Sequence, residues 1–248
     1  MENPSYIAIS QLGALRRQLD VTANNVANIS TPGFQGERLI FETLLSDMAG
    51  NGGLNGPGSK VAFAVDKGLW RDTRPGNVER TGNQFDVALV GPGYIAVQTE
   101  SGIRYTRAGS FRPDAQGRLV LGNGAQLLAD NGGPITIPAG ETSVEIDRRG
   151  TITGKDGKIA RMRVVAIDNE QAMRRTGENL LTTDAEAKPM DDKKTKVAQG
   201  MLEGSNVQGV LEIAQMIELT RRYQSASRIV DQENDRSRRT IEKLTRLS

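Results

Sequence analysis

The chain has 248 residues, of which 37% are hydrophobic and 4% aromatic, and it carries 32 Lys and Arg against 30 Asp and Glu. It contains no His and no Cys, which excludes disulfide bonds, thiolate nucleophiles, imidazole bases and Cys/His zinc sites. The near-balanced charge gives no reason to expect nucleic acid as a partner, and the low apolar share suits an elongated protein stabilised by its neighbours.

The opening residues, MENPSY, lack the basic segment and apolar run of a secretory signal. No stretch of the chain approaches the roughly 18 apolar residues that a membrane-spanning helix needs. We therefore expect no membrane insertion, and an exit from the cytoplasm, if there is one, by a route other than general secretion.

The first predicted element is a helix that ends before Pro32 and Gly33, because these residues disfavour its continuation. Its apolar residues recur at alternating spacings of four and three, which is typical of a helix packed on another helix. The residues of this seam are Ala8, Leu12, Leu15, Leu19, Thr22, Val26 and Ile29.

The middle of the chain is predicted to be all-β. Residues 49–59 are rich in Gly and Asn and read as a flexible linker, and residues 184–199 read as an exposed polar loop. Between them, from about 61 to 183, the pattern has period two with frequent turns, including hairpins at 100–102 and at the Gly-Asn-Gly of 122–124. Short strands without intervening helices indicate an antiparallel meander or a barrel-like domain.

The last predicted element is a helix of about 40 residues, at 1.5 Å rise per residue roughly 60 Å long. Its expected cap is Ser205 or Asn206, since either side chain can accept hydrogen bonds from the free amides of the first turn. Two rows of residues recur every seven positions along it. They are Ile213, Thr220, Ser227, Asn234 and Ile241, and Met216, Tyr223, Val230, Ser237 and Leu244.

Together these patterns predict an α+β protein. Its long N- and C-terminal helices would pack as a coiled-coil-like pair, with an antiparallel, barrel-like all-β domain inserted between them. An alternative is that both helices cover one globular domain, but the last helix is longer than such a domain is wide. The predicted division is a helical domain at 1–35 and 205–248, a connector at 36–60, a β domain at 61–183 and a connecting loop at 184–204.

Three motifs stand out. Residues 23–34 read ANNVANISTPGF, residues 81–89 read TGNQFDVAL and are followed by YTRAGSF at 105–111, and residues 199–207 read QGMLEGSNV. The amides of Asn24, Asn25 and Asn28 could cap their own helix, but three in five positions exceed what one helix end can use. We therefore favour hydrogen bonds from these amides to neighbouring subunits.

In this order, and with two of them near the chain ends, the motifs resemble those of the bacterial flagellar rod and hook protein family. The resemblance covers residues 1–48, 78–137 and 197–248. The short length and the opening Met1-Glu2-Asn3 with Tyr6-Ile7-Ala8 are most similar to the proximal rod members, and the distal rod members are the close alternative.

The resemblance implies a structural subunit without a cofactor or small-molecule substrate. It would be exported through the flagellar type III apparatus without a cleaved signal peptide, and would join copies of itself and other rod proteins in a periplasmic helical array that transmits torque. The assembly interface would lie on the helical seams and the terminal motifs. Its residues are Ala8, Leu12, Leu15, Leu19, Asn24, Asn25, Val26, Asn28, Ile29, Pro32, Gly33, Phe34, Gly204, Ser205, Asn206, Val207, Ile213, Met216, Tyr223, Val230, Ile241 and Leu244.

Two other classes of protein were considered. A cell-wall hydrolase could use paired carboxylates, but Asp114, Asp130 and Asp147 sit at turns, where acidic residues are expected for turn geometry alone. A secreted β-rich adhesin with helical ends would not need the Asn-rich and Gly-Ser-Asn motifs together. We therefore expect neither an enzyme nor an adhesin.

Overall fold

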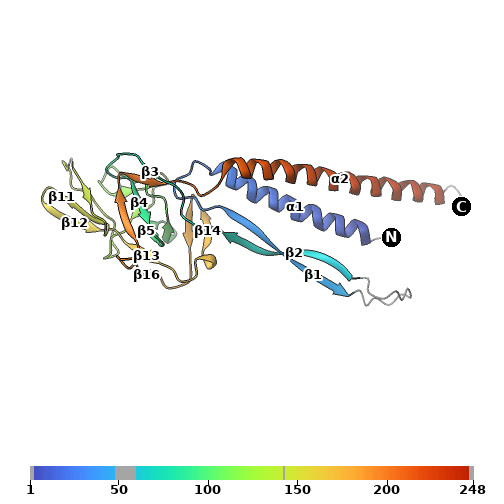
Figure 1. Ribbon diagram of the computed structural model, residues 1–248, viewed down its shortest axis with the longest axis horizontal. Helices are drawn as coiled ribbons and strands as arrows, with labels where there is room; N and C mark the ends of the chain where they lie inside the picture. Colours follow the sequence, from blue (N-terminus) through green and yellow to red (C-terminus); the bar gives the residue numbers. More distant parts are fainter. Residues whose placement is uncertain (1–2, 48–59, 142, 246–248) are drawn as a thin grey trace. The chain divides into compact units, whose positions relative to one another are not determined.

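A computed structural model describes residues 3–47, 60–141 and 143–245 (Figure 1). The linker predicted at 49–59 lies outside these residues. The described residues form two compact units, which are described separately: unit 1 holds residues 3–27, 37–47, 60–70 and 208–245, and unit 2 holds 28–36, 71–141 and 143–207.

The elements follow the chain from one terminal helix to the other. In order they are α1 (Asn3–Ala27), β1 (Glu37–Asp47), β2 (Lys60–Arg71), β3 (Val78–Arg80), β4 (Val87–Val90), β5 (Tyr94–Thr99), β6 (Gly102–Thr106), β7 (Arg112–Pro113), β8 (Leu119–Val120), β9 (Gln126–Leu127), β10 (Glu145–Ile146), β11 (Thr151–Gly154), β12 (Gly157–Arg161), β13 (Val164–Ala166), the 3-10 turn η1 (Glu170–Ala172), β14 (Arg174–Gly177), β15 (Leu180–Thr182), β16 (Lys188–Pro189), β17 (Lys196–Gln199), β18 (Met201–Glu203) and α2 (Gly209–Thr245).

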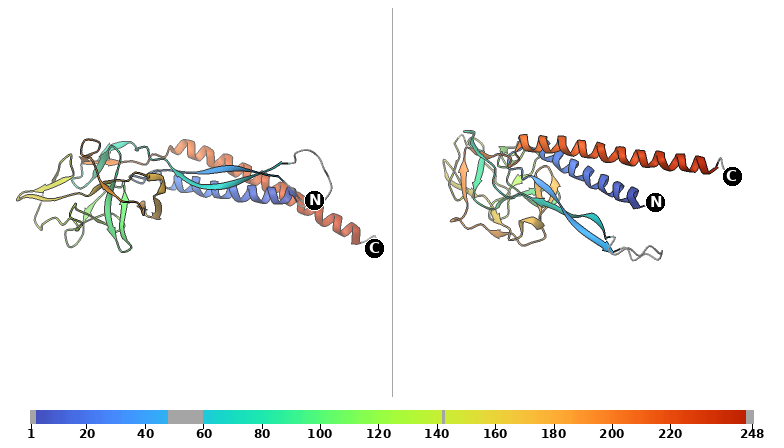
Figure 2. Two further views of the ribbon diagram at one scale, coloured as in Figure 1. Left: turned by 90° about the horizontal axis from the view of Figure 1, so that it is seen from below. Right: turned by 45° about the vertical axis from the view of Figure 1, so that its right-hand side comes forward.

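In unit 1 the two helices lie side by side, and β1 and β2 pair as a two-stranded sheet (Figures 1 and 2). The helices meet through a small apolar cluster. It consists of Leu15, Leu219 and Ala226, with Leu12, Leu19 and Tyr223 packed against them. Neither helix is long and apolar enough to cross a membrane within the part of the chain that the structure describes.

The predicted coiled-coil-like pairing is wrong. On α2 the buried residues are Glu212, Leu219 and Ala226, each one position before the predicted row, whereas Ile213 is 44% exposed. The first turns of α2 are apolar on several faces, so the sequence pattern did not fix which face meets α1. One residue of error turns a helix by about 100° and places the row that begins at Ile213 away from the contact, whereas Tyr223 of the second predicted row packs against the cluster.

Unit 2 contains a nine-stranded antiparallel sheet. Its main order is β14-β15-β6-β5-β9-β8-β7, and β13 pairs with both β5 and β16. Among the described strands the two ends, β14 and β7, do not pair with each other, so the sheet is open and the predicted barrel is wrong. Pro113 in β7 has no N–H to donate, and the β14–β15 register shifts between Arg175 and Gly177, so neither end is suited to closure.

Strand β5 is the centre of this sheet. Its residues Tyr94 to Val97 are all buried, and they alternate between two apolar cores. Ile95 and Val97 belong to the larger core, and Tyr94 and Ala96 to the smaller one. A strand with both faces covered is a near-continuous apolar run, which is what the sequence shows here.

Two short strand pairs bring the end of unit 2 back to its beginning. Strand β17 pairs with β4, and β18 pairs with β3, both antiparallel. Residues 196–203, assigned from sequence to a loop, are therefore mostly strand. Strand β18 follows directly after β17, and the second and third sequence motifs come together here.

Candidate functional site

The three sequence motifs meet at one point inside unit 2, which we call the motif junction: Gly33, Arg107 and Glu203. Each residue comes from a different motif, and they are far apart in the chain. The backbone N–H of Gly33 donates to the carbonyl of Glu203 at 2.7 Å, and the Arg107 guanidinium contacts the Glu203 carboxylate at 2.6 Å. The motifs therefore form a single structural site.

Arg107 is the centre of the junction. Its side chain is 4% exposed and that of Glu203 is 2% exposed, so the ion pair is buried. The guanidinium also donates to the carbonyls of Leu89 (3.2 Å), Gly91 (3.1 Å) and Gly93 (2.8 Å). Arg107 thus supplies hydrogen bonds to carbonyls in and beyond β4, and the carboxylate compensates the cost of burying its charge.

Gly33 is required at the junction by its backbone. Its φ is +65°, a region that disfavours residues with a side chain. A Cβ built here would lie 2.3 Å from the carbonyl carbon of Arg107 and 2.5 Å from the nitrogen of Ala108. The glycine therefore permits both the turn after α1 and the close approach of the first motif to the second.

The β14–β15 hairpin holds the rest of the first motif. Phe34 is buried, and the guanidinium of Arg175 lies 4.4 Å from its ring centroid. Arg175 also donates to the carbonyl of Gln35 at 2.8 Å. Asn179 donates through Nδ2 to the carbonyl of Pro32, also at 2.8 Å.

Asn206 joins three segments instead of capping α2. Its Oδ1 accepts from the N–H of Gly36 at 2.8 Å, and its Nδ2 donates to the carbonyls of Asp72 (2.7 Å) and Arg74 (2.8 Å). Helix α2 begins at Gly209, so the cap predicted at Ser205 or Asn206 is wrong. A side chain with three partners at other segments is not free to accept from the helix.

In unit 1, Asn25 has a comparable role. It is buried; its Oδ1 accepts from the N–H of Glu37 at 3.0 Å and its Nδ2 donates to the Glu37 carbonyl at 2.8 Å. Nδ2 also lies 3.4 Å from Oε2 of Glu212, whose carboxylate is 3.9 Å from Arg38. Asn25 therefore joins α1, β1 and α2 within one subunit, and neither of the interpretations made from sequence describes it.

Asn25→Ala should destabilise the monomer by about 1–3 kcal/mol, because it leaves the Glu37 backbone groups and a buried carboxylate without the amide. Thermal unfolding followed by helical circular dichroism would measure the loss. Gln11→Ala, at an exposed position on the same helix, is the matched control and should cost under about 0.5 kcal/mol. Equal losses would show that Asn25 does not hold these elements together.

Tyr94, between the two parts of the second motif, contacts Gln35, the residue that follows the first motif. Its hydroxyl donates to Oε2 of Glu170 at 3.1 Å and lies 3.3 Å from Oε1 of Gln35. Burial, reinforced by the charge of Glu170, raises the pKa of the Tyr94 hydroxyl to about 12. The phenol therefore stays protonated in the folded protein well above the pH at which a free tyrosine ionises.

This shift predicts a loss of stability at high pH. Because the folded-state pKa lies above the unfolded value near 10, the contribution of Tyr94 is fully present below about pH 10 and is lost as the pH rises through 12. The free energy of unfolding should fall as the pH rises from 10 to 12, and that of the Tyr94→Phe variant should fall less steeply. Urea unfolding of both proteins at several pH values measures the difference; parallel profiles would contradict it.

The other predicted interface residues occupy different environments. Pro32, Gly204, Ser205 and Val207 are half-buried in unit 2, where Gly204 donates to Asn77 and Ser205 accepts from Val207. Asn28 accepts from the hydroxyl of Thr31 at 3.0 Å. On the helices, half-buried positions are Leu12, Leu19, Val26, Met216, Tyr223 and Val230, and Ile29 is half-buried after α1. The side chains of Ala8, Ile241 and Leu244 lie outside the described residues.

Arg107 and Glu203 lie within the second and third motifs, but they were not identified from the sequence as site residues. Each is a single charged residue in a weakly polar stretch, Tyr-Thr-Arg-Ala and Met-Leu-Glu-Gly, and this isolation could have indicated a buried ion pair. Among the described residues, no group of three acidic side chains is placed to hold a metal ion.

In a comparison with known protein families, each of the three motif regions matches a flagellar rod or hook family model. The model "Flagella basal body rod protein" matches residues 6–35, "Flagellar hook protein FlgE/F/G D1 domain" matches 88–154, and "Flagellar basal body rod FlgEFG protein C-terminal" matches 198–243. The flagellar basal-body rod protein FlgF of Caulobacter vibrioides is 36% identical over the full length of both chains. FlgG of Bacillus subtilis is 31% identical over 91% of this chain and 92% of its own. FlgF of Escherichia coli is 28% identical over 99% of each.

Proposed function

The chain belongs to the flagellar basal-body rod and hook protein family, and we propose that it takes the proximal position in the rod. It is a structural subunit of the bacterial flagellar basal-body rod and not an enzyme. The proximal position is supported by the FlgF relative of Caulobacter vibrioides, which matches over its whole length. The distal position is the alternative, because FlgG relatives are similar at 31% identity.

The subunit would polymerise with its copies and other rod proteins through the faces of its helices that remain exposed. Large apolar side chains are exposed in the first turns of α2: Val210 is 83%, Leu211 61% and Ile217 49% exposed. A helix that is apolar on several faces is normally buried, and α1 covers only one face of α2. The export apparatus, a periplasmic location and export without signal cleavage belong to the same proposal.

The residues of the predicted interface divide into two roles under this proposal. Those that join separate segments of unit 2, such as Gly33 and Asn206, would hold the subunit in the shape required for assembly. Those exposed on the helices, such as Ile213 and Asn24, would contact neighbouring subunits. A rod that transmits torque requires both a rigid subunit and an extended interface.

Ile213→Asp tests the second role. The side chain is exposed in the single subunit, so the substitution should change monomer stability by less than about 0.5 kcal/mol. In the assembled rod it would bury a carboxylate at every copy, at a cost of several kcal/mol each. We expect cells with this variant to export the subunit but to lack hook-bearing basal bodies.

Gln224→Asp is the control, because it introduces the same charge at an exposed polar position of α2. Counting hook-bearing basal bodies by electron microscopy, in a strain whose own gene is deleted, compares the two. Normal numbers with Ile213→Asp would show that this face of α2 is not an assembly surface.

A further inference from the structure

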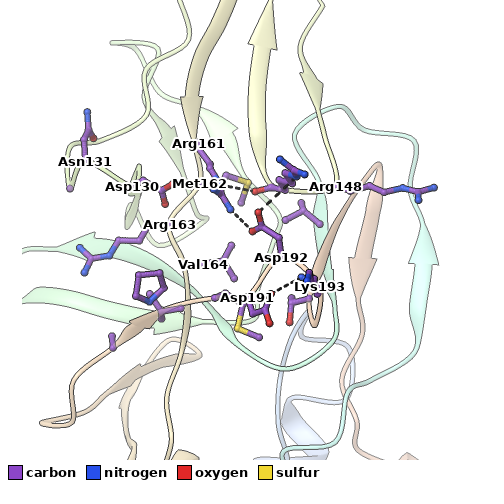
Figure 3. A pocket seen from close by; sticks show the side chains of 18 residues that line it. Asp130, Asn131, Arg148, Arg161, Met162, Arg163, Val164, Asp191, Asp192 and Lys193 are labelled. Carbon is purple, nitrogen blue, oxygen red and sulfur yellow. Dashed lines mark hydrogen bonds and ion pairs between the residues drawn. The ribbon is translucent and has the colours of Figure 1, made fainter.

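Unit 2 has an open groove of about 920 Å³, whose lining contains none of the motif junction residues Gly33, Arg107 and Glu203. Figure 3 shows its lining side chains. They come from three parts of the chain: the turn at 130–132, the stretches 148–149 and 161–165 on either side of the β11–β12 hairpin, and the segment 187–197. The rod function proposed above does not use this groove.

Cations outnumber acids in the lining. It has five cationic side chains, Arg148, Arg149, Arg161, Arg163 and Lys193, and three acidic ones, Asp130, Asp191 and Asp192. The groove therefore has an excess of positive charge on a concave surface, where low-dielectric walls strengthen its potential.

The acids are already engaged by other groups of the groove. Asp192 pairs with Arg161 and lies 3.8 Å from Arg149, and Asp130 lies 3.5 Å from Arg161. Asp191 accepts from the N–H of Lys193 at 3.0 Å, as turn aspartates do. These contacts leave the excess positive charge on other side chains.

Arg148 and Arg163 carry that excess. Neither guanidinium forms an ion pair or a hydrogen bond with any residue in the described part of the chain. In Figure 3, Arg161 and Asp192 point toward each other in the middle of the groove, whereas Arg148 and Arg163 extend outward on opposite sides. A guanidinium suits carboxylates especially well, because its planar fork can donate two parallel hydrogen bonds.

Part of the groove surface is apolar. Val164, Ala187, Pro189 and Met190 contribute to its lining. A ligand that is charged along its whole length would leave this surface without a matching contact, whereas a peptide with both carboxylate and apolar side chains would match both parts.

We propose that this groove binds an acidic peptide segment of a partner protein, in which carboxylates alternate with apolar side chains. The carboxylates would reach Arg148 and Arg163, and the apolar side chains would contact Met190 and Val164.

A fluorescein-labelled octapeptide that alternates Glu and Leu is a suitable probe, with the Gln/Leu octapeptide as its neutral counterpart. By fluorescence anisotropy, the full chain should bind the acidic peptide at least tenfold more tightly, and more weakly as salt rises. The double variant Arg148→Ala, Arg163→Ala should lose at least tenfold of that affinity. Met190→Gln should weaken binding of the Glu/Leu peptide but not binding of octaglutamate.

The double variant Arg80→Ala, Arg174→Ala is the matched control, because it removes the same charge from exposed positions outside the groove. Unchanged binding by this control supports the proposal; an equal loss, or no binding by the unchanged protein, overturns it. Tighter binding of heparin with the same arginine dependence would assign the groove to a polyanionic glycan instead. Self-association that only the groove variant abolishes would assign it to a second copy.

Discussion

Arg107→Met should destabilise unit 2 by about 3–5 kcal/mol. It removes the guanidinium while keeping most of the volume, so Glu203 becomes a buried charge without its partner. It also leaves the carbonyls of Leu89, Gly91 and Gly93 without their donor. A loss of this size approaches the whole stability of a typical domain.

Urea unfolding of the full chain, followed by near-ultraviolet circular dichroism of the buried Tyr94 and Tyr105, would measure this loss. Arg107→Lys keeps the positive charge but lacks the planar guanidinium, so its free energy of unfolding should lie between those of the wild type and Arg107→Met. Arg118→Met is the control, because its pair with Asp114 is partly exposed and solvent screens it, so it should contribute little to stability. The junction would have no special role if the two Met variants lost the same stability.

Gly33→Ala should destabilise the same unit by roughly 2–5 kcal/mol. About 1–2 kcal/mol comes from the positive φ, which a residue with a Cβ adopts at a cost. A further 1–3 kcal/mol is expected from the clash with the backbone of Arg107, since the first and second motifs must move apart. In cells we expect fewer hook-bearing basal bodies, because the subunit would no longer hold its assembly shape.

Two other glycines separate these causes. Gly82 also has a positive φ, +75°, but a Cβ there would meet no atom within 4 Å, so Gly82→Ala should show the conformational cost alone. Gly13 lies inside α1 with open space around it, and Gly13→Ala should stabilise the helix by up to about 1 kcal/mol. If Gly33→Ala were no worse than Gly82→Ala, the close approach at the junction would be unimportant.

Local signals in the sequence predicted local structure well. The hairpin at Gly122–Gly124 is present between β8 and β9, because its Asn-Gly turn determines the backbone over a few residues. The hairpin predicted at 100–102 is present between β5 and β6, and the structure adds that both faces of β5 are buried. These features depend on neighbours in the sequence.

Features that depend on distant residues were missed. Strand β17 begins with Lys196 and ends with Gln199, so its sequence resembles a polar loop. It and β18 are strands because they pair with segments more than 100 residues earlier. The partner of Arg107 lies 96 residues away, so its burial could not be inferred from its neighbours. The motifs that carry the family resemblance were visible, but their meeting point was not.

The most direct test of the central claim, that this chain is a subunit of the flagellar rod, is to locate it in purified basal bodies. An epitope inserted at the exposed β11–β12 turn, between Lys155 and Asp156, should leave assembly intact. Gold-labelled antibody and electron microscopy should place the tag on the rod, and strains lacking the gene should have neither complete rods nor hooks. Gold label confined to the hook or filament, or complete rods in the deletion strain, would contradict the account.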